Sequence, residues 1–154
     1  MSLVTFLCPS RGRPESLRKS IESLRATAYD HDCFDVLTYI DADDPCLAEY
    51  SALAAFPGPG VRLRNIVGPS LGYARLNECI SEGLIPVAEG QWLWLWNDDA
   101  IMDTERWDIQ IRKHPINCVL NPDTNHQSHA TGLNVFPAVP KAWVDLVGWA
   151  RNGA

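Results

Sequence analysis

An uninterrupted run of large apolar residues from Trp92 to Trp96, which breaks abruptly into Asn97, Asp98 and Asp99, constrains the fold more than any other segment. Such a run is typical of a strand buried on both faces of a parallel sheet. Carboxylates at the end of a buried strand need compensation by water or by a cation. Oxygen ligands suit Mg²⁺ and Mn²⁺, which join carboxylates to substrate phosphates. The segment therefore indicates a metal–diphosphate site, and the alternative is a solvated turn.

The rest of the chain alternates strand-like segments with segments of helical spacing. Pro14 and Glu15 favour a helix start, and Leu17, Ile21 and Leu24 then repeat along one helix face. The pattern predicts strands over 3–8, 34–40, 61–67 and 91–96, shorter strands over 117–120 and 133–136, and helices over 14–27, 47–56, 71–83, 104–113 and 141–147. This alternation predicts a single Rossmann-like α/β domain over 1–154, with a mostly parallel central sheet flanked by helices.

Composition and charge narrow the class of protein. The chain has 154 residues, of which 46% are hydrophobic and 21% charged, the balance of a globular domain with a substantial core. A net charge of −6 argues against nucleic acid or an anionic membrane as a partner. No segment reaches the ~18 apolar residues of a transmembrane helix. The five cysteines form no C-x-x-C pair, which favours reduced thiols and a cytoplasmic location.

Charged clusters follow three of the expected strands. Arg11 and Arg13 follow the first strand, Asp41, Asp43 and Asp44 the second, and Asn97, Asp98 and Asp99 the fourth. Because such sheets bind ligands beyond the carboxyl ends of their strands, we expect these clusters to meet at one edge. Guanidinium groups suit phosphate oxygens, and Asp41 is placed to accept a hydrogen bond from a nucleobase or a ribose. The simpler interpretation is solvent-exposed arginines, helix caps and turns.

Three further side chains are candidates for the same site. Arg75 would neutralise charge on a metal-bound diphosphate, or it pairs with Glu78 or Glu82 on the surface of its helix. His126 and His129 lie in a long polar loop, where one of them could complete a metal shell that already holds aspartates. A loop histidine is, however, more often simply solvated.

Four short motifs, taken in order, resemble those of nucleotide-sugar glycosyltransferases of the GT-A fold, similar to the large inverting family that makes polysaccharides. The motifs are 4–14 (VTFLCPSRGRP), 38–44 (TYIDADD), 72–77 (GYARLN) and 96–99 (WNDD). The resemblance implies a GT-A-like domain, a nucleoside-diphosphate sugar of the UDP or GDP type as donor, and Mn²⁺ or Mg²⁺ as cofactor.

The resemblance also implies roles for individual residues. It places Pro9, Arg11, Arg13, Asp41, Arg75, Asn77 and Asp98 in the nucleotide-sugar site. There, Asp41 would bind the base, and Arg75 would approach the diphosphate and stabilise the leaving group. In the acidic metal motif, Asp99 would be the direct ligand and Asp98 a second ligand nearer the ribose or the sugar. Asn97 takes the first position of the usual D-x-D pattern.

The chain departs from the family near 147–149, beyond which family members continue with an acidic catalytic base and acceptor-binding helices. No base can be assigned within the sequence. Three interpretations stay open: an unusually small member, a fragment with a short or missing C-terminal part, or a subunit completed by a partner. A homo-oligomer is one form that such completion could take.

The leading function is metal-dependent, inverting transfer of a sugar from a nucleoside-diphosphate sugar to an unknown acceptor hydroxyl. The first alternative is a non-catalytic nucleotide-sugar-binding module. The second alternative is a metal-dependent phosphohydrolase that uses Asp41, Asp43 and Asp98. It is weaker, because the Asp41-x-Asp43 pair follows the second strand and lacks the Thr or Val that the pattern requires.

Overall fold

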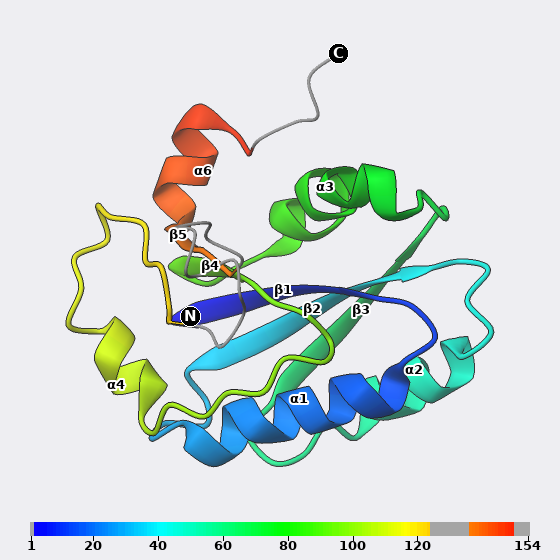
Figure 1. Ribbon diagram of the computed structural model, residues 1–154, viewed down its shortest axis with the longest axis horizontal. Coiled ribbons are helices and arrows are strands. Elements are labelled where there is room, and N and C mark those ends of the chain that lie inside the picture. Colours follow the sequence, from blue (N-terminus) through cyan, green and yellow to red (C-terminus); the bar gives the residue numbers. More distant parts are fainter. Residues whose placement is uncertain (1, 124–135, 150–154) are drawn as a thin grey trace.

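The computed structural model describes residues 2–123 and 136–149, in which helices cover both faces of a five-stranded sheet (Figure 1). The strands are β1 (Val4–Ser10), β2 (Phe34–Asp41), β3 (Arg62–Gly68), β4 (Trp92–Leu95) and β5 (Ala138–Pro140). Their order across the sheet is β3-β2-β1-β4-β5. The first four run parallel, and β5 pairs antiparallel with β4. The expected α/β architecture with a mostly parallel sheet is confirmed.

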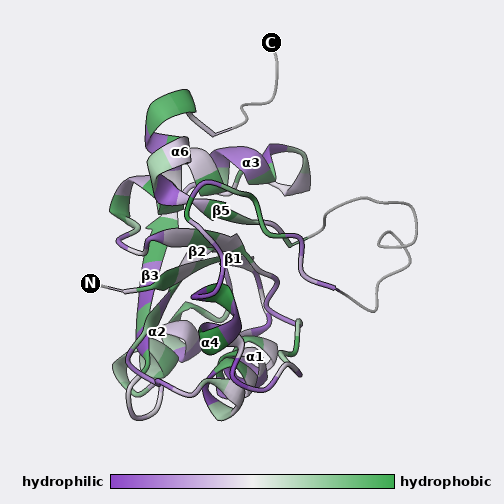
Figure 2. Cartoon of the chain, turned by 90° about the vertical axis from the view of Figure 1, so that its left-hand side faces the viewer, coloured by the Kyte–Doolittle hydropathy of each residue, from purple (hydrophilic) through white to green (hydrophobic). Residues whose placement is uncertain are grey.

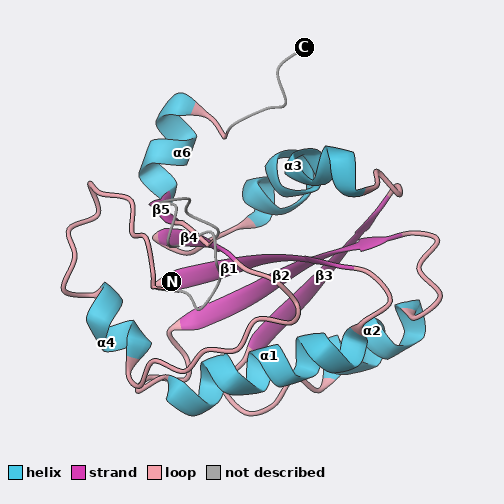
Figure 3. Cartoon of the chain, in the orientation of Figure 1, coloured by secondary structure: helices cyan, strands magenta, loops and turns pink. Residues whose placement is uncertain are grey.

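The helices form two layers (Figure 3). One face of the sheet is covered by α1 (Pro14–Thr27), α2 (Leu47–Ala55) and α4 (Trp107–Ile111), and the other by the helical segment 73–87, which includes α3 (Leu76–Glu78), and by α6 (Lys141–Val147). Pro14 occupies the first turn of α1 and Glu15 adds an acidic charge there, as the sequence predicts. None of the helices among the described residues is long and apolar enough to cross a bilayer.

The two faces of the sheet build two hydrophobic cores. Phe6 of β1 points toward α1 and α4, where its ring stacks on Trp94 with the centroids 5.2 Å apart. Leu7 points the opposite way and packs with Leu93 of β4 and Leu84 of the segment 73–87. This alternation buries β1 and β4 on both faces, as the apolar run of β4 indicates.

Three expected elements differ from the observed ones. The helix expected over 104–113 is shorter, because Arg106 takes a left-handed conformation with φ of 55° and α4 begins only at Trp107. The strand expected over 117–120 is reduced to one bridge between Leu120 and Ala138. Of the strand expected over 133–136, only Phe136 lies within the described residues, and the strand there is β5, which starts at Ala138.

The helix expected over 71–83 is irregular. It opens with a 3₁₀ turn (Tyr73–Arg75), passes through α3, widens into a π-helical turn (Cys79–Leu84) and ends in a second 3₁₀ turn (Ile85–Val87). A π turn holds one residue more than an α turn and is uncommon. It brings Ile80 and Leu84 onto the sheet, where both are buried.

The far end of α6 leaves apolar side chains uncovered within the described part of the chain. Leu146 and Val147 are largely exposed, and Trp143 is partly exposed. Figure 2 shows this end of the helix coloured as hydrophobic.

Candidate functional site

The loops that follow β1, β2 and β4 lie side by side at one edge of the sheet. β1 pairs in parallel with β2 on one side and with β4 on the other, so all three carboxyl ends point the same way. Ser10 lies opposite Ile40 in this register, and Arg11 then meets Asp41. The expectation that the charged clusters share one edge is confirmed.

Asp98 and Asp99 share one cation, the guanidinium group of Arg13. Nη2 of Arg13 lies 2.8 Å from Asp98 Oδ1, and Nη1 lies 3.1 Å from Asp99 Oδ2. The side chain of Asp98 is only 1% exposed, whereas that of Asp99 is 58% exposed. Burial raises the pKa of Asp98, and the hydrogen bond from Ser10 and the charge of Arg13 offset part of that rise.

A chain of hydrogen bonds through β1 and α2 also fixes Asp98. Ser10 Oγ donates to Asp98 Oδ2 over 2.6 Å, and this uses the only proton of the hydroxyl. Tyr50 Oη, 2.6 Å from Ser10 Oγ, is therefore the donor of that pair. Tyr50 Oη in turn accepts the backbone N–H of Arg13 over 2.9 Å. Because the side chain of Arg13 reaches Asp98, the network closes on itself and ties the loops after β1 and β4 to α2.

The acidic pair has the donor atoms that a divalent cation takes. Asp98 Oδ1 is buried, and within residues 2–123 and 136–149 it receives no well-oriented hydrogen bond, although Arg13 Nη2 is close. Asp99 adds an exposed carboxylate. Mg²⁺ and Mn²⁺ commonly use one or two carboxylates and fill their shell with water and phosphate oxygens, so the pair fits such an ion.

The remaining ligands of such an ion would come from solvent or substrate. No group of three or more His, Cys, Asp or Glu side chains suited to a metal occurs among the described residues. His126 and His129 lie outside the described residues, so their proposed part in a metal shell stays a prediction.

Arg11 contacts polar side chains at the ends of β2 and β3. Its Nη1 contacts Asp41 and lies 2.7 Å from Asp43 Oδ1 and 3.1 Å from Ser70 Oγ. The hydrogen bond from Arg11 lowers the pKa of Asp43. Asp41, expected to bind the base, is thus held beside a cation with its side chain 13% exposed. The phosphohydrolase alternative, which would use Asp41 as a nucleophile, stays a prediction.

Asp44 fixes the turn that contains Arg11 and Arg13. Its Oδ2 accepts the backbone N–H of Gly12 over 2.7 Å, and its Oδ1 accepts that of Cys46 over 2.8 Å. Gly12 has φ of 66°, a left-handed conformation that glycine adopts without strain. The expected helix cap is not formed, because α2 begins at Leu47 with Cys46 as its N-cap residue and no side-chain hydrogen bond caps it. Asp44 instead joins the backbone just before α2 to the arginine loop.

Arg75 makes the helix-surface ion pair that was the alternative to a diphosphate contact. Its Nε donates to Glu78 Oε1 over 2.7 Å, and its side chain is more than half exposed. Asn77 lies half-buried on α3, and Pro9 lies half-buried on β1 opposite Tyr39. The contacts of these three residues with a nucleotide sugar stay predictions.

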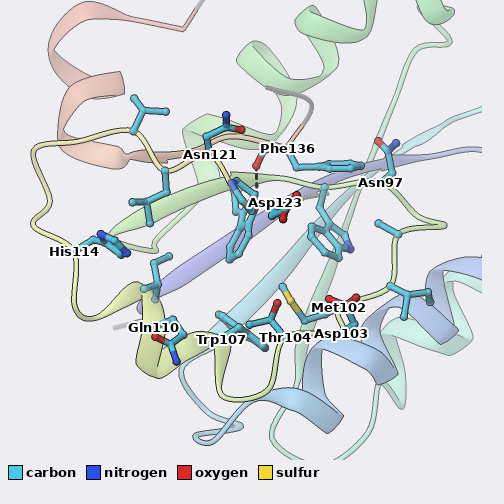
Figure 4. Close-up of a pocket in the computed structure, with 18 of the residues that line it drawn as sticks. Asn97, Met102, Asp103, Thr104, Trp107, Gln110, His114, Asn121, Asp123 and Phe136 are labelled. Atoms are coloured by element: carbon cyan, nitrogen blue, oxygen red, sulfur yellow. Dashed lines mark hydrogen bonds between the residues drawn. The ribbon is translucent and has the colours of Figure 1, made fainter. Parts of the chain in front are cut away.

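A cavity of about 1180 Å³ opens beside Asp99, between β4, α4 and residues 118–123 (Figure 4). Its aromatic wall includes Trp94, Trp96 and Trp107, and Nε1 of Trp94 donates to the carbonyl of Phe136 over 2.9 Å. Its polar lining comprises Asn97, Asp99, Asp103, Thr104, Gln110, His114, Asn121 and Asp123. In Figure 4, Asn121 lies across the cavity from Gln110 and Thr104.

Sequence reasoning missed this cavity. Trp94, Trp96 and Trp107 are largely buried, yet each also lines the cavity. The polar lining comes from four separate segments with no shared spacing, so no motif joins them. The one usable signal was the density of polar residues around the tryptophans after β4.

Comparisons with known proteins bear on the fold. No family model and no curated protein matches the sequence. Among solved structures, the mannosyltransferase PcManGT from Pyrobaculum calidifontis, in complex with GDP-Man and Mn²⁺, is 12% identical and matches with a TM-score of 0.72. The match covers 95% of this chain and 46% of that one.

Two further glycosyltransferase structures match in the same way. S. aureus TarS in complex with UDP is 11% identical, with a TM-score of 0.63 over 94% of this chain and 48% of that one. The apo form of the glycosyltransferase GlyE from Streptococcus pneumoniae TIGR4 is 11% identical, with a TM-score of 0.61 over 95% and 36%. The chain thus spans less than half of each of these proteins. The matched sheet and helices show that this chain has the GT-A fold of nucleotide-sugar glycosyltransferases.

Proposed function

We propose that the chain binds a nucleoside-diphosphate sugar of the UDP or GDP type together with Mn²⁺ or Mg²⁺, and transfers the sugar to an acceptor hydroxyl with inversion. One observation carries the proposal. Two arginine–aspartate clusters, Arg11 with Asp41 and Arg13 with Asp98 and Asp99, meet at the sheet edge where α/β folds bind ligands. The complexes of PcManGT with GDP-Man and Mn²⁺ and of TarS with UDP support it.

The side chains divide the work of donor binding. Asp41 accepts a hydrogen bond from the nucleobase, and Arg11 and Arg13 offer guanidinium groups to the diphosphate oxygens. Asp98 and Asp99 would hold the cation, which would supply positive charge to offset the negative charge that develops on the diphosphate. Arg75, whose guanidinium group pairs with Glu78 in the structure, would add a further positive charge near the leaving group. Pro9 and Asn77 line the nucleotide pocket.

The acceptor enters the cavity beside Asp99. Its aromatic wall offers a surface for the apolar face of a sugar ring, and its polar lining offers partners for hydroxyl groups. Inverting transfer needs a group that takes the proton of the acceptor hydroxyl. Asp103, His114, Cys118 and Asp123 are the other titratable described residues that line the cavity, and the base is not assigned among them.

Nucleotide binding with and without metal tests the proposal. Calorimetric titration of UDP and of GDP should give tighter binding with Mn²⁺ than without it, and Asp99→Ala should remove that difference. Asp145→Ala is the matched control, because Asp145 is an exposed aspartate that pairs with Lys141 on α6, outside the site. Equal affinity with and without Mn²⁺, in the wild type and in Asp99→Ala alike, would refute metal-dependent binding.

A second candidate is a nucleotide-sugar-binding module that does not transfer sugar, either alone or as a subunit that a partner or a second copy completes. The observation in its favour is that the chain spans less than half of each matched glycosyltransferase. Release of UDP or GDP from the corresponding sugar nucleotides, measured over a panel of sugar acceptors, separates the two candidates. Tight binding without any release favours the module. The cytoplasmic location stays a prediction.

A further inference from the structure

The charges around Arg13 affect how readily a cation binds Asp98 and Asp99. The inference drawn from them rests on the proposed function. Asp98 and Asp99 together carry two negative charges, and the single positive charge of Arg13 bridges them. A carboxylate buried as fully as Asp98 is unfavourable without a cation beside it. Arg13 therefore supplies part of the compensation that a divalent cation would supply.

The guanidinium group and a cation would compete for the same oxygens. Arg13 Nη2 stands 2.8 Å from Asp98 Oδ1, the buried oxygen that lacks a well-oriented hydrogen bond. Nη1 stands 3.1 Å from Asp99 Oδ2. An ion that bridges the two carboxylates from this side must displace the guanidinium group, because like charges cannot share so small a space at low cost.

Arg13 is built so that its side chain can leave while its backbone stays. The side chain is 55% exposed, so a path to solvent is open. The backbone N–H is held by Tyr50 Oη, and Pro14 follows at once as the first residue of α1. Movement is thereby restricted to the side chain, which keeps the guanidinium group near the sheet edge. Phosphate oxygens are the ligands that a displaced guanidinium group binds best.

We propose that Arg13 is an exchangeable internal counter-ion. Its guanidinium group occupies the Asp98–Asp99 pair and blocks cation binding until it binds a diphosphate instead. The cation alone then binds weakly, because it must break both ion pairs of Arg13. A bound nucleoside diphosphate removes that competitor and also offers its own oxygens. Cation and nucleotide therefore bind with positive cooperativity, part of which is due to Arg13.

Titration of Mn²⁺ without nucleotide, followed by the electron paramagnetic resonance signal of the free ion, tests this directly. Arg13→Met should bind Mn²⁺ more tightly than the wild type, by roughly 5- to 150-fold, the usual range of coupling between two sites. Arg13→Lys, which keeps the charge but lacks the planar fork whose two nitrogens contact the two carboxylates, should fall between the two. Arg18→Met is the matched control, since it removes an arginine of α1 that pairs only with Glu15 and Glu22 among the described residues.

The same titration in the presence of UDP or GDP completes the test. The nucleotide should raise the Mn²⁺ affinity of the wild type by a larger factor than that of Arg13→Met. Circular dichroism confirms that each variant is folded, and a general loss of structure would weaken Mn²⁺ binding rather than strengthen it. If folded Arg13→Met and Arg13→Lys bind Mn²⁺ no more tightly than the wild type, the counter-ion role is overturned. If the counter-ion role fails but the protein still binds UDP or GDP, the proposed function is unaffected. If the protein binds neither nucleotide, the proposed function itself is overturned.

Discussion

Tyr50→Phe isolates the contribution of one hydroxyl group to the site. The ring is 1% exposed and stays packed in the variant, so only the hydroxyl is lost. That hydroxyl donates to Ser10 and accepts the backbone N–H of Arg13. A hydrogen bond contributes about 1 kcal/mol net, and a buried donor left without an acceptor costs about 1–3 kcal/mol. Because the N–H of Arg13 is only partly buried, we expect a loss of about 2 kcal/mol in the free energy of unfolding.

Urea unfolding followed by tryptophan fluorescence measures this loss. For a chain of this size, about 2 kcal/mol corresponds to a fall in Tm of roughly 4–8 °C. Tyr73→Phe is the control, because Tyr73 is 91% exposed and the same substitution there should change stability by less than about 0.5 kcal/mol. If Tyr50→Phe is as stable as the control, the closed network from Arg13 through Tyr50 and Ser10 to Asp98 does not hold the loops.

Three other perturbations test the fold around the site. Gly90→Ala would place a Cβ atom 2.4 Å from the backbone nitrogen of Thr5, so it should lower the free energy of unfolding by about 1–3 kcal/mol, and an unchanged urea midpoint would contradict that close approach. Asp108→Asn should lower the free energy of unfolding by about 2 kcal/mol in the same assay. The buried carboxylate accepts two backbone N–H groups in the loop after α1, whereas an amide offers only one acceptor oxygen. A variant as stable as the wild type would disprove this role. Burial raises the pKa of Cys33 to about 12, so the unfolded chain loses this proton first, and stability should fall as the pH rises from about 9 toward 12. Urea unfolding at several pH values should show that the stability of Cys33→Ala falls less steeply with pH than that of the wild type. The same dependence of stability on pH in both proteins would refute the raised pKa of Cys33.

Apolar patterning was sufficient for the parts of the fold that local sequence controls. The run from Trp92 to Trp96 predicts a doubly buried strand, and β4 is one. The helix expected over 14–27 matches α1 at both ends, because Pro14 and the regular spacing of Leu17 and Ile21 all favour it. The edge where the charged clusters meet also follows from sequence, since parallel strands put their carboxyl ends together.

Features that depend on tertiary contacts were not predictable in this way. Leu76, Ile80 and Gly83 keep a spacing typical of a regular helix, yet the segment forms 3₁₀ and π turns, with Ile80 and Leu84 packed in the core. The left-handed Arg106 shortens α4, and no residue type there signals it. The start of β5 at Ala138 depends on pairing with β4, a strand far away in sequence.

The site, too, has features that follow from local sequence and features that depend on tertiary contacts. Sequence places Arg11, Arg13 and the aspartates at one edge, but it cannot say which arginine pairs with which carboxylate, because that depends on side-chain rotamers and on burial. The sharing of Arg13 by Asp98 and Asp99, and the link through Tyr50, required the structure. The cavity beside Asp99 required it as well, because segments without a common spacing line it.

The wide turn Cys79–Leu84 has a consequence for how this chain tolerates changes in length. Since a π turn holds one residue more than an α turn, deleting a single residue there can restore ordinary helical winding between α3 and the 3₁₀ turn that follows it. The same deletion inside α1 would rotate the remainder of that helix by about a quarter of a turn or more and swing its apolar stripe off the sheet. Among natural or engineered variants of this domain, one-residue length differences should therefore gather in this turn and be absent from α1.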